Sequence, residues 1–141
     1  MTSPITDQEA RREALNIKAS HIVQAPAGSG KTELLIQRFL KLLGHVEKPE
    51  RILAMTFTRK AAGEMKKRVL DALKLARNAT PPKEAHEKTT WEIARQALHH
   101  SEKQEWRILD NPQRLKIQTI DSFCASLVKQ TPLLSGMGSL L

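Results

Sequence analysis

Apolar residues follow two patterns along this chain, and together they predict short strands alternating with helices. Nearly continuous apolar runs of strand length occur at 51–57 and 115–120, with a shorter run at 21–25. Spacings of three and four residues, typical of one buried helical face, occur over 30–43 and 60–77. This alternation indicates an α/β fold with a parallel sheet, and the run at 51–57 suits a strand covered on both faces.

Two of the predicted helices have a clear apolar face. On the helix at 30–43 the expected buried residues are Leu35, Phe39, Leu42 and Leu43. On the helix at 60–77 they are Ala62, Met65, Val69, Ala72, Leu73 and Ala76. These faces predict that both helices pack against a common core.

Polar residues at suitable positions predict where two further helices begin. Thr6 and Glu9 have the spacing of a capping box, which predicts a helix from Thr6 through about Ile17. Asp121 is placed to cap a short helix over 122–129.

Proline-containing breaks divide the chain into three segments. The breaks lie at 78–82 and 111–112, where prolines end any helix. They predict the segments 1–77, 78–112 and 113–141, with the polar, helical middle segment inserted between two strands of one sheet.

The stretch Ala25-Pro26-Ala27-Gly28-Ser29-Gly30-Lys31-Thr32 lies between the first apolar run and a helix, which is the setting of a phosphate-binding loop. Its glycines let backbone N–H groups approach a phosphate, and the helix N-terminus favours an anion. Lys31 is expected to reach the β- and γ-phosphates of ATP, and the Thr32 hydroxyl to hold Mg²⁺. The general motif has glycine where Ala25 stands here.

A second group of polar residues follows the strand at 51–57. It comprises Thr56, Phe57, Thr58, Arg59 and Lys60, at the carboxyl end of the strand, where open α/β sheets bind ligands. Two cations at a helix N-terminus oppose the helix dipole, so an external anion would compensate them. Phe57 either offers its ring to a nucleobase or lies in the core, and the residues alone leave both readings open.

A third group repeats this layout at the end of the strand 115–120. It comprises Thr119, Ser122 and Phe123, two hydroxyls and an aromatic ring at the start of a helix. Gln8, on the first predicted helix, is a candidate to hydrogen-bond an adenine edge.

Composition narrows the classes of protein without choosing one. The 141 residues fit one domain, and the net charge of +8 favours a polyanion such as nucleic acid, although a solvated basic surface would give the same charge. No apolar stretch approaches membrane-spanning length, so neither membrane insertion nor a signal peptide is expected, and a cytoplasmic location follows as the default. Cys124 is the only cysteine, which excludes an intrachain disulfide, and it is expected to be a small core residue.

Three motifs in this order resemble the superfamily 1 DNA helicases of the UvrD/Rep/RecB kind. Asp7-Gln8 looks like their adenine-reading motif, and residues 25–32 look like their Walker A motif, where alanine for the first glycine is common. Residues 52–65 closely match their motif Ia, a contact to single-stranded DNA. Residues 117–124 resemble the following motif, usually with histidine where Asp121 stands, and lean toward the RecB/AddA helicase–nuclease branch.

The resemblance implies a P-loop NTPase fold of the RecA type. Segment 1–77 would be the first part of its ATP-binding lobe, 78–112 part of a helical insertion, and 113–141 the truncated return to the lobe. ATP and Mg²⁺ would be the cofactors, and the partners would be single-stranded DNA and further subunits of a helicase–nuclease complex. The implied nucleotide contacts are Gln8, the loop 25–32 and Glu33. The implied DNA contacts are Thr56, Phe57, Thr58, Arg59, Lys60, Thr119, Ser122 and Phe123.

The resemblance also implies that several parts of the motor lie outside this chain. These are an acidic Walker B motif, a second lobe and the arginine that the second lobe supplies. The chain alone is therefore expected to bind nucleotide and DNA weakly and to hydrolyse almost no ATP. A small P-loop kinase or phosphotransferase, and a nucleic-acid-binding module without catalysis, remain the alternatives.

Overall fold

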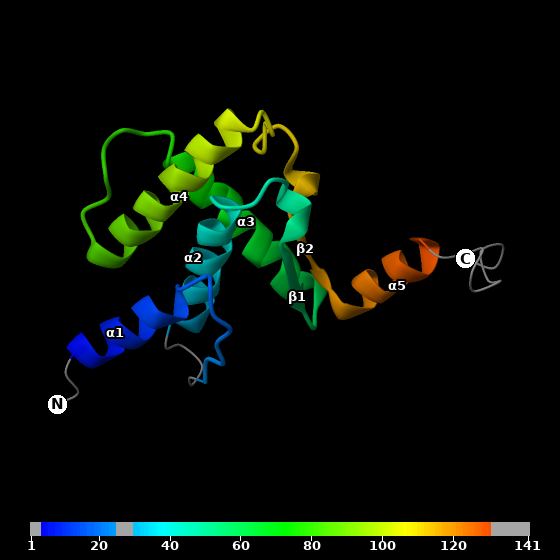
Figure 1. Ribbon diagram of the computed structural model, residues 1–141, viewed down its shortest axis with the longest axis horizontal. Helices are drawn as coiled ribbons and strands as arrows, with labels where there is room; N and C mark the ends of the chain where they lie inside the picture. Colours follow the sequence, from blue (N-terminus) through cyan, green and yellow to red (C-terminus); the bar gives the residue numbers. More distant parts are fainter. Residues whose placement is uncertain (1–3, 25–29, 131–141) are drawn as a thin grey trace.

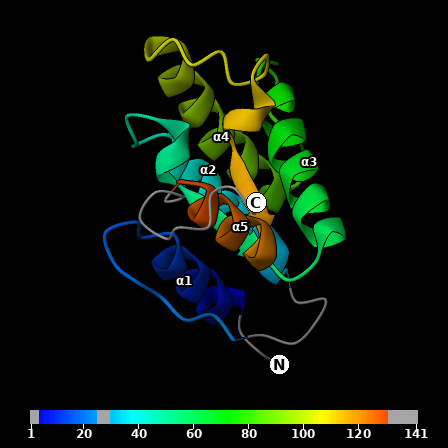
Figure 2. The same ribbon diagram turned by 90° about the vertical axis from the view of Figure 1, so that its right-hand side faces the viewer.

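The computed structural model describes residues 4–24 and 30–130, with side chains from Glu9 onward (Figure 1). In chain order the elements are α1 (Pro4–Ala14), α2 (Lys31–Leu43), the 3-10 turn η1 (Pro49–Arg51), β1 (Leu53–Thr56), α3 (Arg59–Leu75), α4 (Ala85–Lys103), the 3-10 turn η2 (Pro112–Arg114), β2 (Lys116–Thr119) and α5 (Ile120–Gln130). Helices α2 and α3 form the centre, while α5 extends away from the body and faces the viewer in Figure 2.

Strands β1 and β2 form a parallel pair in which Leu53 lies opposite Lys116 and Thr56 opposite Thr119. A 3-10 turn precedes each strand, so η1 and η2 lie at the same edge of the sheet. The Arg114 guanidinium joins these turns, because its Nε donates to both Glu50 carboxylate oxygens at 3.0 and 3.2 Å. This ion pair aligns the two strands where they enter the sheet.

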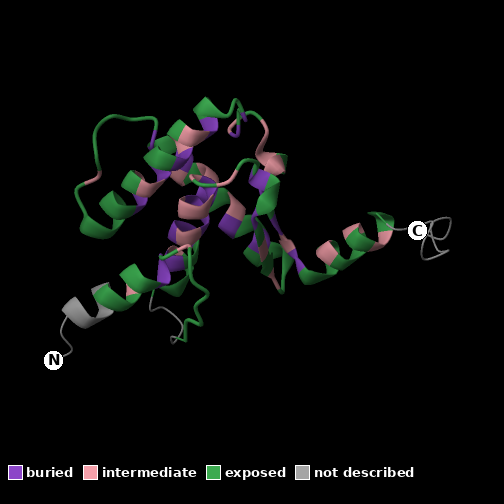
Figure 3. Ribbon diagram, viewed as in Figure 1, coloured by how far each residue is buried: buried purple, intermediate pink, exposed green. Residues whose placement is uncertain are grey.

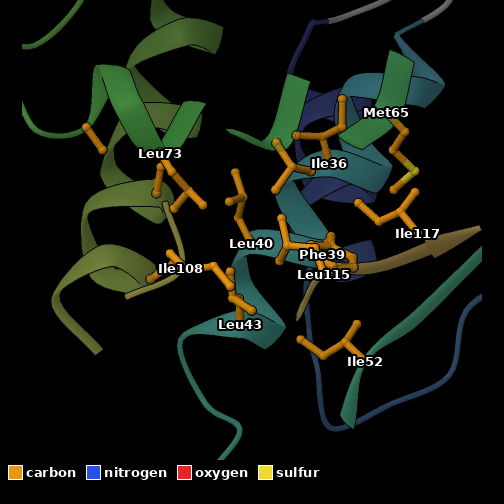
Figure 4. Close-up of a cluster of buried hydrophobic side chains, with 14 of the residues drawn as sticks. Ile36, Phe39, Leu40, Leu43, Ile52, Met65, Leu73, Ile108, Leu115 and Ile117 are labelled. Atoms are coloured by element: carbon orange, nitrogen blue, oxygen red, sulfur yellow. The ribbon is translucent and has the colours of Figure 1, made fainter. Parts of the chain in front are cut away.

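The core lies between α2, α3, α4 and the two strands (Figures 3 and 4). Leu40, Leu43, Val69 and Leu73 have no exposed surface. The other large buried side chains are Ile36, Phe39, Ile52, Met65, Trp106, Ile108, Leu115 and Ile117. The predicted core face of α3 is confirmed at Ala62, Met65, Val69, Leu73 and Ala76.

Helix α4 packs against both α2 and α3, and its Ala94 and Ala97 are fully buried. Small residues let α2 and α4 approach closely. A Cβ added at Gly44, directly after α2, would lie 3.7 Å from the backbone of Ala97. The predicted helix within 78–112 is therefore present, and it shares the core of the flanking segments. The division into segments 1–77, 78–112 and 113–141 stays a prediction.

The strand predicted at 21–25 is wrong over its described part, because residues 21–24 form no regular structure. The described sheet consists of β1 and β2, and residues 21–24 pair with neither strand. Without a neighbouring strand an apolar run gains no ladder hydrogen bonds, and Ile22 is 91% exposed. Likewise β1 is not covered on both faces, since Leu53 and Met55 are exposed.

Both predicted helix caps are wrong. Helix α1 begins at Pro4, a residue suited to the first helical turn, so Thr6 lies inside the helix. Helix α5 begins directly after β2, and the Thr119 hydroxyl accepts from Ser122 N at 3.1 Å, so Thr119 rather than Asp121 satisfies that N–H group. Two burial predictions also fail, because Leu35 and Cys124 are exposed.

No helix among the described residues is long and apolar enough to span a membrane.

Candidate nucleotide and nucleic-acid sites

The described part of the predicted phosphate loop is the start of α2. Gly30 precedes the helix with a φ of 84°, a left-handed conformation that glycine adopts readily. Lys31 and Thr32 are the first two helical residues, and both are exposed. The first N–H groups of α2 and its dipole make this end suitable for an anion. Ala25, Pro26, Ala27, Gly28 and Ser29 lie outside the described residues.

Glu33, the next residue of α2, is turned toward other helices. One carboxylate oxygen pairs with Arg68 Nη2 on α3 at 2.5 Å. The other accepts a hydrogen bond from the Thr90 hydroxyl on α4 at 2.6 Å. A direct contact between Glu33 and nucleotide stays a prediction, and these two partners give the carboxylate a structural role as well.

A cavity of about 330 Å³ lies beside the start of α2. Its walls include Arg11 of α1, the exposed segment 21–24, and Lys31. Arg11 Nη1 donates to the Gly30 carbonyl oxygen at 3.4 Å, so α1 contacts the end of the phosphate loop. Gln8 lies on α1, and its side chain is outside the described residues. Arg11 was not predicted from the sequence, although its place one helical turn after Gln8 was a usable signal.

Helices α1 and α2 are also joined by Arg38. Its guanidinium donates to the carbonyl oxygens of Ala14, Asn16 and Ala19 at 2.6, 3.1 and 3.1 Å. These carbonyls lie at and beyond the end of α1, where helix backbone acceptors have no partner within the helix. Arg38 therefore holds the end of α1 against the helix that begins with Lys31.

The predicted DNA contacts meet at the carboxyl edge of the two strands. Thr56 and Thr119 end β1 and β2 in register. The Thr58 hydroxyl accepts from Ala61 N at 3.1 Å and caps α3, just as Thr119 caps α5. The Thr119 hydroxyl in turn donates to Ser122 Oγ at 2.9 Å. Several of these hydroxyls thus order the local backbone.

A cavity of about 340 Å³ lies at this edge. It is lined by Phe57, Arg59, Thr119, Asp121, Ser122 and Ala125. The Phe57 ring is 91% exposed, so of the two readings left open by the sequence the structure excludes the buried one. Arg59 and Lys60 are exposed in the first turn of α3, which has no acidic residue, whereas Phe123 is partly buried.

Asp121 gives this cavity a mixed charge. It lies in the first turn of α5, where a carboxylate suits the helix dipole. The same carboxylate would repel a phosphate. A phosphate would therefore fit the α3 side of the cavity, which Arg59 lines.

One group of described side chains has ligand atoms close enough to share a metal ion: those of Glu84, His86 and Glu87 lie within 4.8 Å of one another. All three are exposed at the start of α4, and exposed carboxylates often come this close without an ion. We assign this group no role.

Comparison with known proteins identifies the family. The UvrD/REP helicase N-terminal domain matches residues 6–138, and the chain belongs to this family. Similar proteins include three that are named as subunits of an ATP-dependent helicase/nuclease. The one from Clostridium perfringens (strain ATCC 13124) is 33% identical over 86% of the chain, the one from Anoxybacillus flavithermus 36% over 77%, and the one from Exiguobacterium sibiricum 35% over 89%. They confirm the predicted lean toward the helicase–nuclease branch.

These relatives are much longer than this chain. The matched residues cover 8% of the Clostridium perfringens and Anoxybacillus flavithermus proteins and 9% of the Exiguobacterium sibiricum protein. No solved structure matches the chain significantly. The architecture is α/β with two parallel strands among the described residues, and the predicted P-loop NTPase fold of the RecA type stays a prediction.

Proposed function

We propose that this chain is the N-terminal ATP-binding part of an ATP-dependent DNA helicase that acts in DNA repair or recombination. Membership of the UvrD/REP family supports this, as do the relatives named as helicase/nuclease subunits. The family resemblance also supports movement along the DNA strand in the 3′–5′ direction. The word "subunit" in those names supports a second chain as partner, and a DNA substrate fits a cytoplasmic location.

The start of α2 would hold the phosphates of ATP. Its fit to MgATP rests on the left-handed Gly30 and on a helix N-terminus whose first two side chains are exposed. Lys31 would place its ammonium group against the β- and γ-phosphates, and Thr32 would offer its hydroxyl to Mg²⁺. The metal would neutralise charge that develops on the transferred phosphoryl group. The remaining predicted contacts are Gln8, Ala25, Pro26, Ala27, Gly28, Ser29 and Glu33.

The shared edge of β1 and β2 would hold single-stranded DNA. The exposed ring of Phe57 beside the exposed Arg59 carries this part of the proposal. An aromatic face stacks on any base, and a nearby cation pairs with the backbone phosphate. Lys60 would add a second cation, while Thr56, Thr58, Thr119, Ser122 and Phe123 would shape the edge.

The chain by itself is proposed to bind both ligands weakly and to turn over almost no ATP. Phosphoryl transfer needs groups that stabilise charge from several directions at once. The phosphate loop supplies such groups from one direction. Sustained hydrolysis by the purified chain that is lost in Lys31→Ala would contradict this part of the proposal.

A titration of a fluorescent oligo-dT with the purified chain at two salt concentrations tests the DNA part. We expect binding that weakens as salt rises, because phosphate contacts release counterions. Arg59→Ala and Lys60→Ala should each weaken binding and reduce the salt slope by about 1. Lys74→Ala, on the last turn of the same helix, is the matched control and should have little effect.

The same titration, together with a titration of the chain with MgATP, separates the alternative functions. A metabolite kinase would show little oligonucleotide binding, and its binding would not depend on Arg59. A nucleic-acid-binding module without catalysis would bind the oligonucleotide but not MgATP. Either result would refute the helicase proposal.

A further inference from the structure

A series of polar contacts joins three helices immediately behind the start of α2. Glu33 of α2 pairs with Arg68 of α3 at 2.5 Å, and the Thr90 hydroxyl of α4 donates to the other Glu33 oxygen at 2.6 Å. Gln37, one turn further along α2, donates from Nε2 to the Thr90 hydroxyl at 2.9 Å. Gln37 and Thr90 are only 6% and 8% exposed.

Burial gives this network energetic weight. Charge-assisted hydrogen bonds are stronger than neutral ones, and partial removal from water strengthens them further. The Glu33 side chain is 24% exposed, and two neighbouring members of the network are buried. Glu33 and Arg68 lie 35 positions apart on two different helices. The contact therefore fixes α2 relative to α3.

The network joins the two helices that begin at the candidate sites. Helix α2 begins at the candidate ATP site, and α3 begins at the candidate DNA site. Glu33 directly follows Thr32, the residue placed for the metal of MgATP. Arg68 lies on the helix whose first residues are Arg59 and Lys60, and a helix transmits a shift along its axis as a rigid element over the roughly 14 Å between Arg59 and Arg68. A change in the Glu33–Arg68 pair therefore bears on the position of the DNA edge.

We infer that the Glu33–Arg68 contact, held by Thr90, couples nucleotide binding at α2 to DNA binding at α3. The inference rests on the proposed function of the two sites. An occupied site would bring the metal of MgATP to Thr32, the residue before Glu33, and its charge would compete with Arg68 for the Glu33 carboxylate. Arg68 and Thr90 act as positioning residues, since they touch neither ligand. By linkage, DNA must change nucleotide affinity by the same factor.

The test measures the Kd of the chain for fluorescent oligo-dT with and without a saturating non-hydrolysable ATP analogue and Mg²⁺. The coupling ratio is the quotient of these two Kd values. For the unmodified chain we expect a ratio that differs from 1 by at least about fivefold, the lower end of typical coupling between sites. In Arg68→Gln and Thr90→Val the ratio should fall toward 1, while each ligand measured alone keeps its affinity within about twofold.

Two further variants separate coupling from a general structural effect. Lys74→Gln removes a charge from the same helix without touching the network, so its coupling ratio should match that of the unmodified chain. Arg68→Lys, which keeps a cation opposite Glu33, should retain more of the ratio than Arg68→Gln. Circular dichroism checks that each variant is folded, and Arg68 tolerates substitution because its side chain is 47% exposed.

The outcomes distinguish this inference from the function on which it rests. A ratio of 1 in the unmodified chain, or a ratio unaffected by Arg68→Gln and Thr90→Val, overturns the coupling and leaves the proposed function standing. Failure of the unmodified chain to bind either ligand refutes the proposed function, and the coupling fails with it.

Discussion

Two glycine-to-alanine substitutions should change stability in opposite directions. Gly30 has a φ of 84°, and an alanine Cβ there would lie 2.8 Å from Arg11 Nη2. Gly63 lies inside α3, and its Cβ position has no atom within 4 Å. The same chemical change is therefore strained at Gly30 and unhindered at Gly63.

The backbone sets the expected magnitudes. A non-glycine residue in the left-handed region costs about 1–2 kcal/mol, so Gly30→Ala should lower the free energy of unfolding by that amount. The clash with Arg11 adds little, because a guanidinium at the end of a flexible side chain can move. Gly63→Ala should raise the free energy of unfolding by about 0.5–1 kcal/mol, since alanine loses less entropy in a helix.

Urea unfolding followed by circular dichroism measures both changes. We also expect Gly30→Ala to weaken binding of MgATP, whereas Gly63→Ala should leave it unchanged. A neutral or stabilising Gly30→Ala would show that the left-handed geometry at the start of α2 is wrong. A destabilising Gly63→Ala would show that this face of α3 is covered.

Two other substitutions test the edges of the small sheet. Phe57→Ala should weaken oligonucleotide binding by about 5- to 150-fold, because stacking on a base contributes about 1–3 kcal/mol. It should leave the free energy of unfolding unchanged, because Phe57 is exposed. An unaltered Kd in the fluorescence anisotropy titration would remove Phe57 from the DNA site. Glu50→Gln should destabilise the chain by about 0.2–1 kcal/mol at pH 7, as for other exposed ion pairs. Burial by itself raises the pKa of the Glu50 carboxyl, but the hydrogen bonds and charge of Arg114, with a smaller contribution from Lys116, outweigh it and lower that pKa. The pair's contribution is therefore complete above the ordinary carboxyl pKa of about 4.3 and is lost as the pH falls through the lower pKa of the folded chain. Thermal melts of both proteins from pH 7 to pH 3 should converge at the acidic end, and a constant gap would contradict this assignment.

The sequence predicted most of the helices and strands because their patterns are local. The faces of α3 and the run at β1 depend on spacing within one segment, and both elements are present. The strand at 21–25 failed because strand formation depends on a neighbouring strand, which no local pattern supplies. The Thr6 cap failed because α1 begins two residues earlier, at Pro4, whose ring suits a first helical turn. The Asp121 cap failed because the Thr119 hydroxyl accepts from Ser122 N instead.

In the candidate sites, too, local patterns could be predicted and contacts between separate elements could not. Residues near Lys31 and Arg59 could be predicted, since a phosphate loop and a strand-end cluster are continuous in sequence. The contacts of Glu33 with Arg68 and Thr90 could not, because the three residues come from separate helices. The hydrogen bond from Arg38 to the Ala14 carbonyl at the end of α1 could not be predicted either, because it joins two separate helices.

Calorimetric titration of the purified chain with MgATP tests the central claim most directly. We predict saturable binding that needs Mg²⁺ and is lost in Lys31→Ala, while Lys41→Ala, which removes a lysine from the last turn of the same helix, retains it. MgATP binding that survives Lys31→Ala, or equal losses in Lys31→Ala and Lys41→Ala, would contradict the assignment of the start of α2 as the ATP site.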